Sequence, residues 1–211
     1  MSAEASERAR PTTSCPAAIN SGTTAEPTQP DARGRLAQAA FELYAEQGYE
    51  RTTGAEIARR AGMHERSFFR LFSDKREVPF HGMEQVALEF ASNIRQAPPE
   101  ATAIQATRLA VEERCRLIQQ SRAHAKLRRE VVSGSADLRE RDLAKHGELV
   151  DAIAAELQER GADKMASTLV AESCVMGMRI AVGAWLDGDQ DTELVDVFGA
   201  AMAELATLVG G

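Results

Sequence analysis

The spacing of apolar residues constrains the fold of this chain more than any other feature. From residue 33 onwards they recur every three or four positions, as Leu36, Ala40 and Leu43 do, and this is the spacing of one face of an α-helix. No stretch shows the alternation of apolar and polar residues that marks a half-buried strand. The pattern therefore predicts an all-α protein of about nine helices.

Residues 1–32 have a different composition. They hold four of the seven prolines, many Ser and Thr residues and almost no large apolar residue. Such a segment cannot bury enough surface to offset its loss of conformational entropy on ordering. We therefore expect a disordered tail, in which Arg8 and Arg10 are solvated.

Capping residues and glycines set the expected helix boundaries. Thr53 opens a short helix through a capping box with Glu56, and Gly62 ends it. Ser73 and Asp74 cap a longer fourth helix, and consecutive prolines break the chain near residue 98. The other expected helices cover residues 33–47, 65–72, about 100–120, 122–132, a segment ending at Gly161, 163–186 and 192–209.

The two short segments around Gly62 have the pattern of a helix-turn-helix. A small residue, Ala58, stands where the second helix must cross close to the first, and Gly62 stands at the turn, where a positive φ is cheap only for glycine. An ordinary corner between two helices is the alternative for this pattern. The apolar positions through which the two helices share a core are Ile57, Ala61, Met63, Phe68 and Leu71.

These residues resemble those of a known family. Leu36 to Tyr49 is similar to the first helix of the tetracycline-repressor (TetR) family of bacterial transcription regulators. Thr53 to Gly62, Phe68 to Phe72 and Lys75 resemble its helix-turn-helix and the start of its fourth helix. The resemblance covers about residues 33–78, and the remainder matches only in its helical plan. It implies a DNA-binding domain at 33–78 and a larger ligand-binding and dimerisation domain at 79–211.

The resemblance also implies which residues contact DNA. The exposed face of the second short helix would enter the major groove, with Arg66 reading a base and Ser67 bonding a phosphate. The helix that starts after Thr53 would direct free N–H groups at a phosphate, and Lys75 would place its charge on another. The expected DNA-binding residues are Thr53, His64, Glu65, Arg66, Ser67, Phe69, Arg70 and Lys75.

Three residues depart from the pattern that favours DNA binding. Phe69 stands where the family usually has Tyr, so a hydroxyl group that could bond a phosphate is missing. Glu65 is costly near phosphates unless it accepts a hydrogen bond from a cytosine. Pro79 lies in the first two turns of the expected fourth helix, where it removes a backbone hydrogen bond and favours a kink.

The family plan implies a homodimer formed through the last two helices. Small residues on one side of residues 163–186, such as Gly177, and an apolar stripe on the last helix, such as Phe198, fit this arrangement. They fit a monomeric core equally well. The ligand-binding residues remain unassigned, because each candidate is more simply a core residue. These candidates are Phe90, Val111, Cys115, Ile118, Met176 and Trp185.

Composition excludes several other classes of protein. The chain is 44% hydrophobic and 27% charged with a net charge of −7, so it has no bulk attraction to nucleic acid. Residues 33–79 are the exception, since they hold nine Lys and Arg against seven Asp and Glu. The three cysteines form no paired motif, and Cys115 and Cys174 fit buried core positions. No hydrophobic run approaches the ~20 residues of a membrane span.

These observations together predict the function. We expect no enzymatic activity, no cofactor and no metal, since neither the four histidines nor any nucleotide or hydrolase motif has the necessary spacing. The sequence favours a cytoplasmic, homodimeric repressor that binds double-stranded operator DNA and is released by an unknown small-molecule effector, without a membrane partner. The alternative is a helical ligand-binding or adaptor protein that no longer binds DNA.

Overall fold

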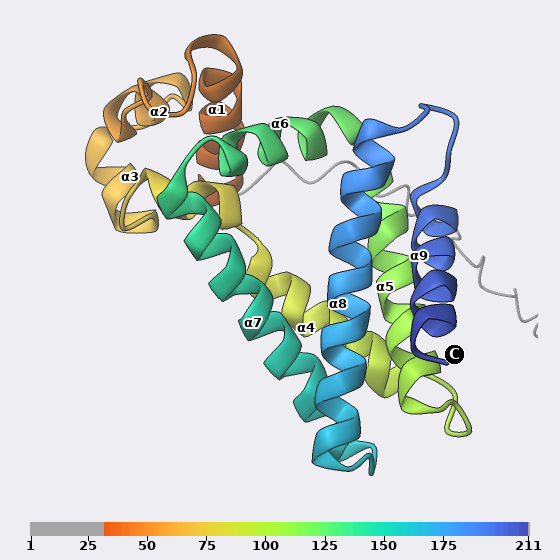
Figure 1. Cartoon of the computed structure of the whole chain (residues 1–211). Helices are drawn as coiled ribbons and strands as arrows, with labels where there is room; N and C mark the ends of the chain where they lie inside the picture. Colours follow the sequence, from red (N-terminus) through yellow and green to blue (C-terminus); the bar gives the residue numbers. More distant parts are fainter. Residues whose placement is uncertain (1–31, 211) are drawn as a thin grey trace, which may run out of the picture.

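The computed structural model describes residues 32–210, and the predicted tail, with Arg8, Arg10 and Cys15, lies outside these residues. The described part contains nine α-helices, one 3-10 helix and no strand, so the predicted all-α fold is confirmed. The helices form a small N-terminal group and a larger bundle of long helices below and beside it (Figure 1).

The N-terminal group contains α1 (Ala32–Gln47), α2 (Gly54–Arg60) and α3 (Glu65–Leu71). Its core consists of the apolar faces that the sequence pattern picked out, including Leu36, Ile57 and Phe68, none of which is exposed. The fully buried side chains of all three helices meet there, so these short helices are held by packing rather than by their own propensity.

The expected fourth helix is divided in two. A 3-10 helix, η1 (Lys75–Phe80), follows the Asp74 cap, and α4 (Met83–Gln96) begins after two intervening residues. Pro79 lies within η1, and Gly82 has φ +88°, in the left-handed region. The proline lacks the N–H that a continuous α-helix needs, and the left-handed glycine reverses the helical path, so the kink expected at Pro79 is a complete break.

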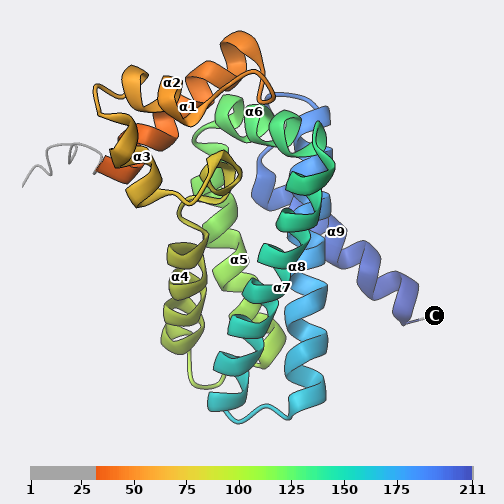
Figure 2. The ribbon, with the colours of Figure 1, turned by 90° about the vertical axis from the view of Figure 1, so that its left-hand side faces the viewer.

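The C-terminal bundle contains five more helices. α7 packs against both α4 and α8, and α8 packs against α5 and α9 (Figure 2). α6 runs across one end of the bundle, between the N-terminal group and the top of α8 (Figure 1). Their bounds are α5 (Ala103–Gln119), α6 (Arg122–Ser133), α7 (Ala136–Glu159), α8 (Lys164–Asp187) and α9 (Leu194–Val209).

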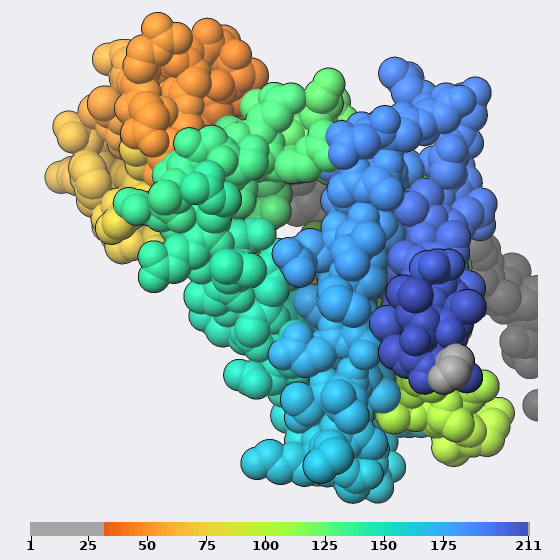
Figure 3. Space-filling view, in the orientation of Figure 1, coloured from red at the N-terminus to blue at the C-terminus, as the bar shows by residue number. Residues whose placement is uncertain are grey.

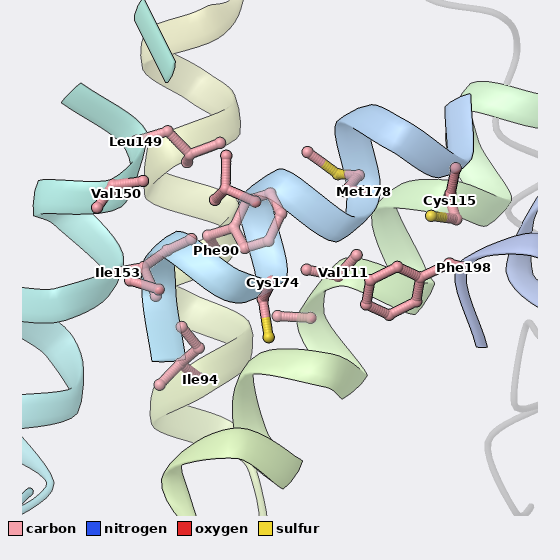
Figure 4. Packing of buried hydrophobic residues seen from close by; sticks show 14 of the residues in the cluster. Phe90, Ile94, Val111, Cys115, Leu149, Val150, Ile153, Cys174, Met178 and Phe198 are labelled. Atoms are coloured by element: carbon pink, nitrogen blue, oxygen red, sulfur yellow. The ribbon is translucent and has the colours of Figure 1, made fainter. Parts of the chain in front are cut away.

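The core of this bundle confirms the prediction for the two cysteines. Cys115 and Cys174 are fully buried among apolar side chains such as Val111 and Phe198 (Figure 4). Burial raises the pKa of each thiol to about 12. Because the thiolate is the reactive form, both residues are inert core groups at neutral pH.

The two parts of the chain share a core. Val131, Val132 and Leu138, from α6 and α7, are buried in the same cluster as the apolar residues of α1 to α3. Val78 and Phe80 of η1 belong to this cluster as well. The tip of the C-terminal bundle therefore completes the N-terminal core, and the expected division at residues 78 and 79 falls inside η1.

The small residues of α8 serve contacts within the chain. A Cβ added to Gly177 would lie 2.6 Å from the Met202 sulfur and 3.4 Å from the Phe198 ring, both on α9. Gly177 therefore allows α9 of the same molecule to approach closely. This contact uses Gly177 within the chain, and the homodimer expected through the last two helices stays a prediction.

One helix passes the length and composition test for a membrane span, contrary to the sequence expectation. It is α8, with a mean hydropathy of 1.4 over an 18-residue window, of which 44% is buried. α8 is packed on three sides by α5, α7 and α9. A core helix of a globular bundle has the same composition, so this position explains its hydropathy.

Candidate nucleic-acid interface and internal cavity

Two glycines set the geometry of the helix-turn-helix. A Cβ on Gly54 would lie 2.8 Å from the ring of the buried Phe68, so the start of α2 approaches α3 more closely than any other residue would allow. Gly62 has φ +69°, and the Met63 N–H donates to the Ala58 carbonyl at 2.8 Å to close the turn. The turn predicted at Gly62 is thus confirmed, and the close approach of the two short helices is found at Gly54.

Long polar side chains fasten α2 and α3 to α1. The Arg33 guanidinium donates twice to the Leu71 carbonyl, at 2.8 and 3.0 Å, and lies 5.6 Å from the centre of the Phe72 ring. Arg60 forms an ion pair with Glu46 at 2.6 Å. These contacts hold the carboxyl end of α3 and the end of α2 against α1, so α3 is presented as part of a rigid unit.

The face of α3 that points away from this unit carries the predicted DNA contacts. His64, Glu65, Arg66 and Arg70 are exposed, and Ser67 is half-buried. Within residues 32–210, the guanidinium groups of Arg66 and Arg70 make no hydrogen bond and no ion pair. The two guanidinium groups stand one helical turn apart and are available to a partner outside the chain.

Phe69 also lies on the outer side of α3. Its side chain is 54% exposed, and its ring meets the buried Phe68 ring edge to face at 5.3 Å. An exposed aromatic ring beside the start of α2 can pack on a DNA backbone but cannot donate a hydrogen bond to it. Phe68 and Phe72 are buried, as expected for core residues.

The backbone amide and the hydroxyl group of Thr53 are already hydrogen-bonded to Glu56. The Thr53 N–H donates to the Glu56 carboxylate at 2.9 Å, and the Thr53 hydroxyl accepts from the Glu56 N–H at 3.2 Å. Hydrogen bonds from the hydroxyl, and then from the amide, hold the pKa of this carboxyl below its ordinary value. The predicted capping box is confirmed. It also places a negative charge at the helix start where a phosphate contact is expected.

Lys75 has an internal role in the structure. Its amine donates to the carbonyls of Tyr49 and Glu50, at 2.9 and 3.1 Å, and lies 4.3 Å from the centre of the Tyr49 ring. The Tyr44 hydroxyl donates to the Lys75 carbonyl at 3.2 Å. Lys75 therefore ties η1 to the turn after α1, and only one of its three N–H donors remains for a phosphate.

A cavity of about 1370 Å³ separates the N-terminal group from the bundle. It is larger than the ~300–1,000 Å³ of most small-molecule sites. The space-filling view shows an opening between α6, α7 and α8 (Figure 3). Its walls come from α1, η1, α4, α5, α6, α7 and α8, and the apolar lining includes Ala37, Phe41, Val86, Ile118, Leu143 and Val182.

Arg128 connects this cavity to the broken fourth helix. Its guanidinium donates to the Pro79 carbonyl at 3.1 Å and to the Asp142 carboxylate at 2.7 Å, and it lies 5.4 Å from the centre of the Phe80 ring. All of these residues except Phe80 line the cavity. A molecule in the cavity would therefore touch the contacts that hold η1 against α6 and α7.

His124 stands one helical turn before Arg128 on α6, against α1. Its ring lies 4.5 Å from the Phe41 ring. Burial, and next the charge of Arg128, lowers the pKa of this imidazole below its ordinary value. His124 is therefore neutral at pH 7 and offers the cavity one donor and one acceptor.

The sequence did not locate this cavity. Of the six residues considered as ligand contacts, only Ile118 lines it. Phe90, Val111, Cys115 and Trp185 are buried in the bundle core, and Met176 is exposed. The polar lining residues were missed. One signal could have pointed to Arg114: it is a charged residue directly before Cys115, which belongs to the apolar face of the same helix.

The described geometry defines a class of protein: an all-α chain with an N-terminal helix-turn-helix that exposes its second short helix, joined to a larger bundle with an internal cavity. A sequence model of the family described as bacterial regulatory proteins, tetR family, matches residues 36–78. The N-terminal part of this chain is thus a helix-turn-helix of the TetR family.

Comparisons with individual proteins agree with this assignment. The chain is 35% identical over 74 residues to the HTH-type transcriptional regulator TcmR of Streptomyces glaucescens; the match covers 35% of this chain and 33% of that protein. The chain therefore matches about a third of the length of this curated relative.

Solved structures show the same fold over most of the chain. The TetR-family repressor FadR of Thermus thermophilus, in complex with lauroyl-CoA, has a TM-score of 0.56 and 18% identity, covering 82% of this chain and 92% of FadR. SmeT, the repressor of a multidrug efflux pump of Stenotrophomonas maltophilia, was solved with triclosan. Its structure has a TM-score of 0.59 and 16% identity, and the match covers 83% of this chain and 90% of SmeT.

Proposed function

We propose that this protein is a homodimeric transcription repressor that binds operator DNA in the cytoplasm through α3 and releases it when a small molecule enters the cavity. DNA binding is supported mainly by the guanidinium groups of Arg66 and Arg70. Both are exposed, have no partner among the described residues, and lie on a helix that is held rigidly by its neighbours. Arg can bond two acceptors of guanine at once, so Arg66 is the best base-reading group on this face.

A second copy supplies the other half of the DNA site. Two recognition helices about one DNA turn apart, ~34 Å, fill successive major grooves. An exposed apolar face of α8 supports this assembly, because large apolar side chains gather there that the rest of the described chain leaves exposed. These are Met165, Leu169, Met176 and Ile180, which are 73%, 61%, 37% and 53% exposed.

Release by a ligand is supported by the position of the cavity. Its walls include α1 of the helix-turn-helix and the Arg128 contacts to η1, so occupancy can shift α3 through two routes. Proteins of similar fold were solved with lauroyl-CoA and with triclosan. By linkage, a ligand that weakens DNA binding must itself bind less tightly to the DNA complex by the same factor.

The DNA-binding part of the proposal is tested by fluorescence anisotropy with the DNA upstream of the protein's own gene and with random DNA, at several salt concentrations. Arg66→Ala is expected to cost about 1–3 kcal/mol on the specific DNA and little on random DNA. Arg116→Ala is the matched control, since Arg116 is exposed on α5, far along the chain from α3. Equal losses on both DNAs would contradict a base-reading role for Arg66.

The same titration separates this function from the alternative of a ligand-binding or adaptor protein that has lost DNA binding. Glu65 and Phe69 favour that alternative, because one repels phosphates and the other lacks a hydroxyl group. A wild-type protein that binds both DNAs weakly and equally would establish the alternative.

A further inference from the structure

The charged lining of the cavity identifies the chemistry of its ligand. Five arginines line it against three carboxylates, which are those of Glu42, Glu89 and Asp142. Glu42 is paired with Arg60 at 3.4 Å, and Asp142 with Arg128 at 2.7 Å. Glu89 is thus the one lining carboxylate, among the described residues, without a close ion pair.

Most of the lining arginines are also engaged. Besides Arg128, Arg129 donates to Asp187 at 2.8 Å, and Arg139 donates to the Ser133 carbonyl at 2.6 Å. Arg179 is exposed at the surface of α8. Arg114 differs from all of them, because it is half-buried and no hydrogen bond to its guanidinium is found in residues 32–210.

Arg114 therefore faces the cavity with most of its hydrogen-bonding capacity unused. Its nearest carboxylate oxygen, on Glu89, is 3.9 Å away, too far for a hydrogen bond. Burial lowers the pKa of this guanidinium, which nevertheless remains charged. The Arg114 side chain is 30% exposed, so solvent reaches its five donors, and an anionic group in the cavity would replace that water with charge-assisted hydrogen bonds.

We propose that the effector is an amphipathic organic anion: an apolar body that fills the cavity and a carboxylate-like group held by Arg114. Glu89 opposes that group and lowers its affinity. This inference rests on the proposed sensor role of the cavity. It adds the sign of the ligand charge and the two residues that decide it.

The test uses the full-length protein and three ten-carbon probes that differ in charge, namely decanoate, 1-decanol and decylammonium, titrated by calorimetry. Decanoate is expected to bind about tenfold or more tightly than the other two, since hydrogen bonds to charged groups contribute roughly this much. Equal affinities, a preference for decylammonium, or no saturable binding of decanoate at millimolar concentration would overturn the proposal.

Substitutions test whether Arg114 and Glu89 cause the preference for decanoate. Arg114→Gln should weaken decanoate about tenfold to a hundredfold and leave decanol unchanged, whereas Arg114→Lys should keep the preference. Glu89→Gln should tighten decanoate and weaken decylammonium, a result that a purely structural role for Arg114 does not produce. Arg116→Gln, two residues away and paired with Glu113 at 3.0 Å, is the matched control and should change neither. Unchanged decanoate affinity in Arg114→Gln would contradict the assignment.

DNA binding, measured in parallel without probes, keeps the two proposals distinct. Wild-type protein that prefers decanoate but does not bind DNA would refute the repressor function and leave the ligand assignment intact. Wild-type protein that binds DNA but shows no preference among the probes would refute the ligand assignment alone.

Discussion

At the scale of single residues, Lys75 shows how a cation in a DNA-binding domain can be committed elsewhere. Its amine bonds two backbone carbonyls and covers the Tyr49 ring, so its charge is neutralised by dipoles of its own chain. By contrast, Arg66 on the neighbouring helix has no such contact. A basic residue therefore stabilises the domain at position 75, whereas a basic residue at position 66 is available to bind DNA.

This contrast predicts different effects of removing the two charges. Lys75→Met should lower the free energy of unfolding by about 1–3 kcal/mol, since it removes two charge-assisted hydrogen bonds and a cation–π contact. Arg66→Ala should leave the free energy of unfolding nearly unchanged. Urea denaturation followed by circular dichroism measures both.

The salt dependence of DNA binding can contradict the internal role of Lys75. A residue that contacts a phosphate contributes about one unit to the slope of binding affinity against salt. If folded Lys75→Met protein shows unchanged stability and a slope lower by one unit, the amine bonds a phosphate in the DNA complex.

At the scale of elements, the break between η1 and α4 replaces a single helix that the caps at Ser73 and Asp74 predicted. Pro79 signalled a disturbance, but Gly82 decided its extent by adopting φ +88°. Glycine is found both inside helices and at breaks, and the sequence around it does not distinguish these cases. The consequence is that motion of α4 reaches the helix-turn-helix through side chains such as Arg128 rather than through a continuous backbone.

Two glycines with equal space around them test this break. Gly82→Ala should destabilise the protein by about 1–3 kcal/mol, because a left-handed backbone is strained for alanine. Gly147→Ala, within α7, should stabilise it by about 0.5–1 kcal/mol, because alanine favours a helix. Neither added Cβ would meet another atom within 4 Å, so thermal unfolding compares backbone effects alone. Equal effects at the two positions would argue against a strained break.

The helices and the helix-turn-helix were predictable because they depend on local signals. Apolar spacing, the Thr53 capping box and the turn at Gly62 each act within a few residues. The cavity was not predictable, because it depends on where helices that are distant in sequence meet. Arg114 and Glu89 become partners only when α4 and α5 pack together, and no periodicity in either helix reports that pairing.

At the scale of the whole molecule, α8 and α9 lie side by side (Figure 3). Among the described residues, large apolar side chains of α8 are exposed on one face. A face of this kind is unusual on a monomer and marks an interaction site. The inner faces of the same helices are used within the chain, as Gly177 and Met202 show. The proposed dimer would therefore use a face of α8 that adjoins the one on which its small residues lie.

A charge placed on that surface should separate the subunits. Leu169→Glu, on α8, is expected to convert a dimer into a monomer at micromolar concentration, because it buries an unpaired carboxylate in an apolar interface. Leu88→Glu is the matched control, since Leu88 is 64% exposed on α4, away from this surface. Light scattering after gel filtration measures the mass of each. If both variants keep the mass of the wild type, this face of α8 does not form the dimer.

The shared core of the N-terminal group limits how this protein can be taken apart or recombined. Val131, Val132 and Leu138 pack against α1, α2 and α3, which lie sixty or more residues earlier in the chain. A fragment ending at residue 78 would expose the apolar surface that these side chains cover. A chimera that grafts this helix-turn-helix onto another sensor must therefore carry the tip of α6 and α7 with it, and evolution by exchange of whole domains faces the same constraint.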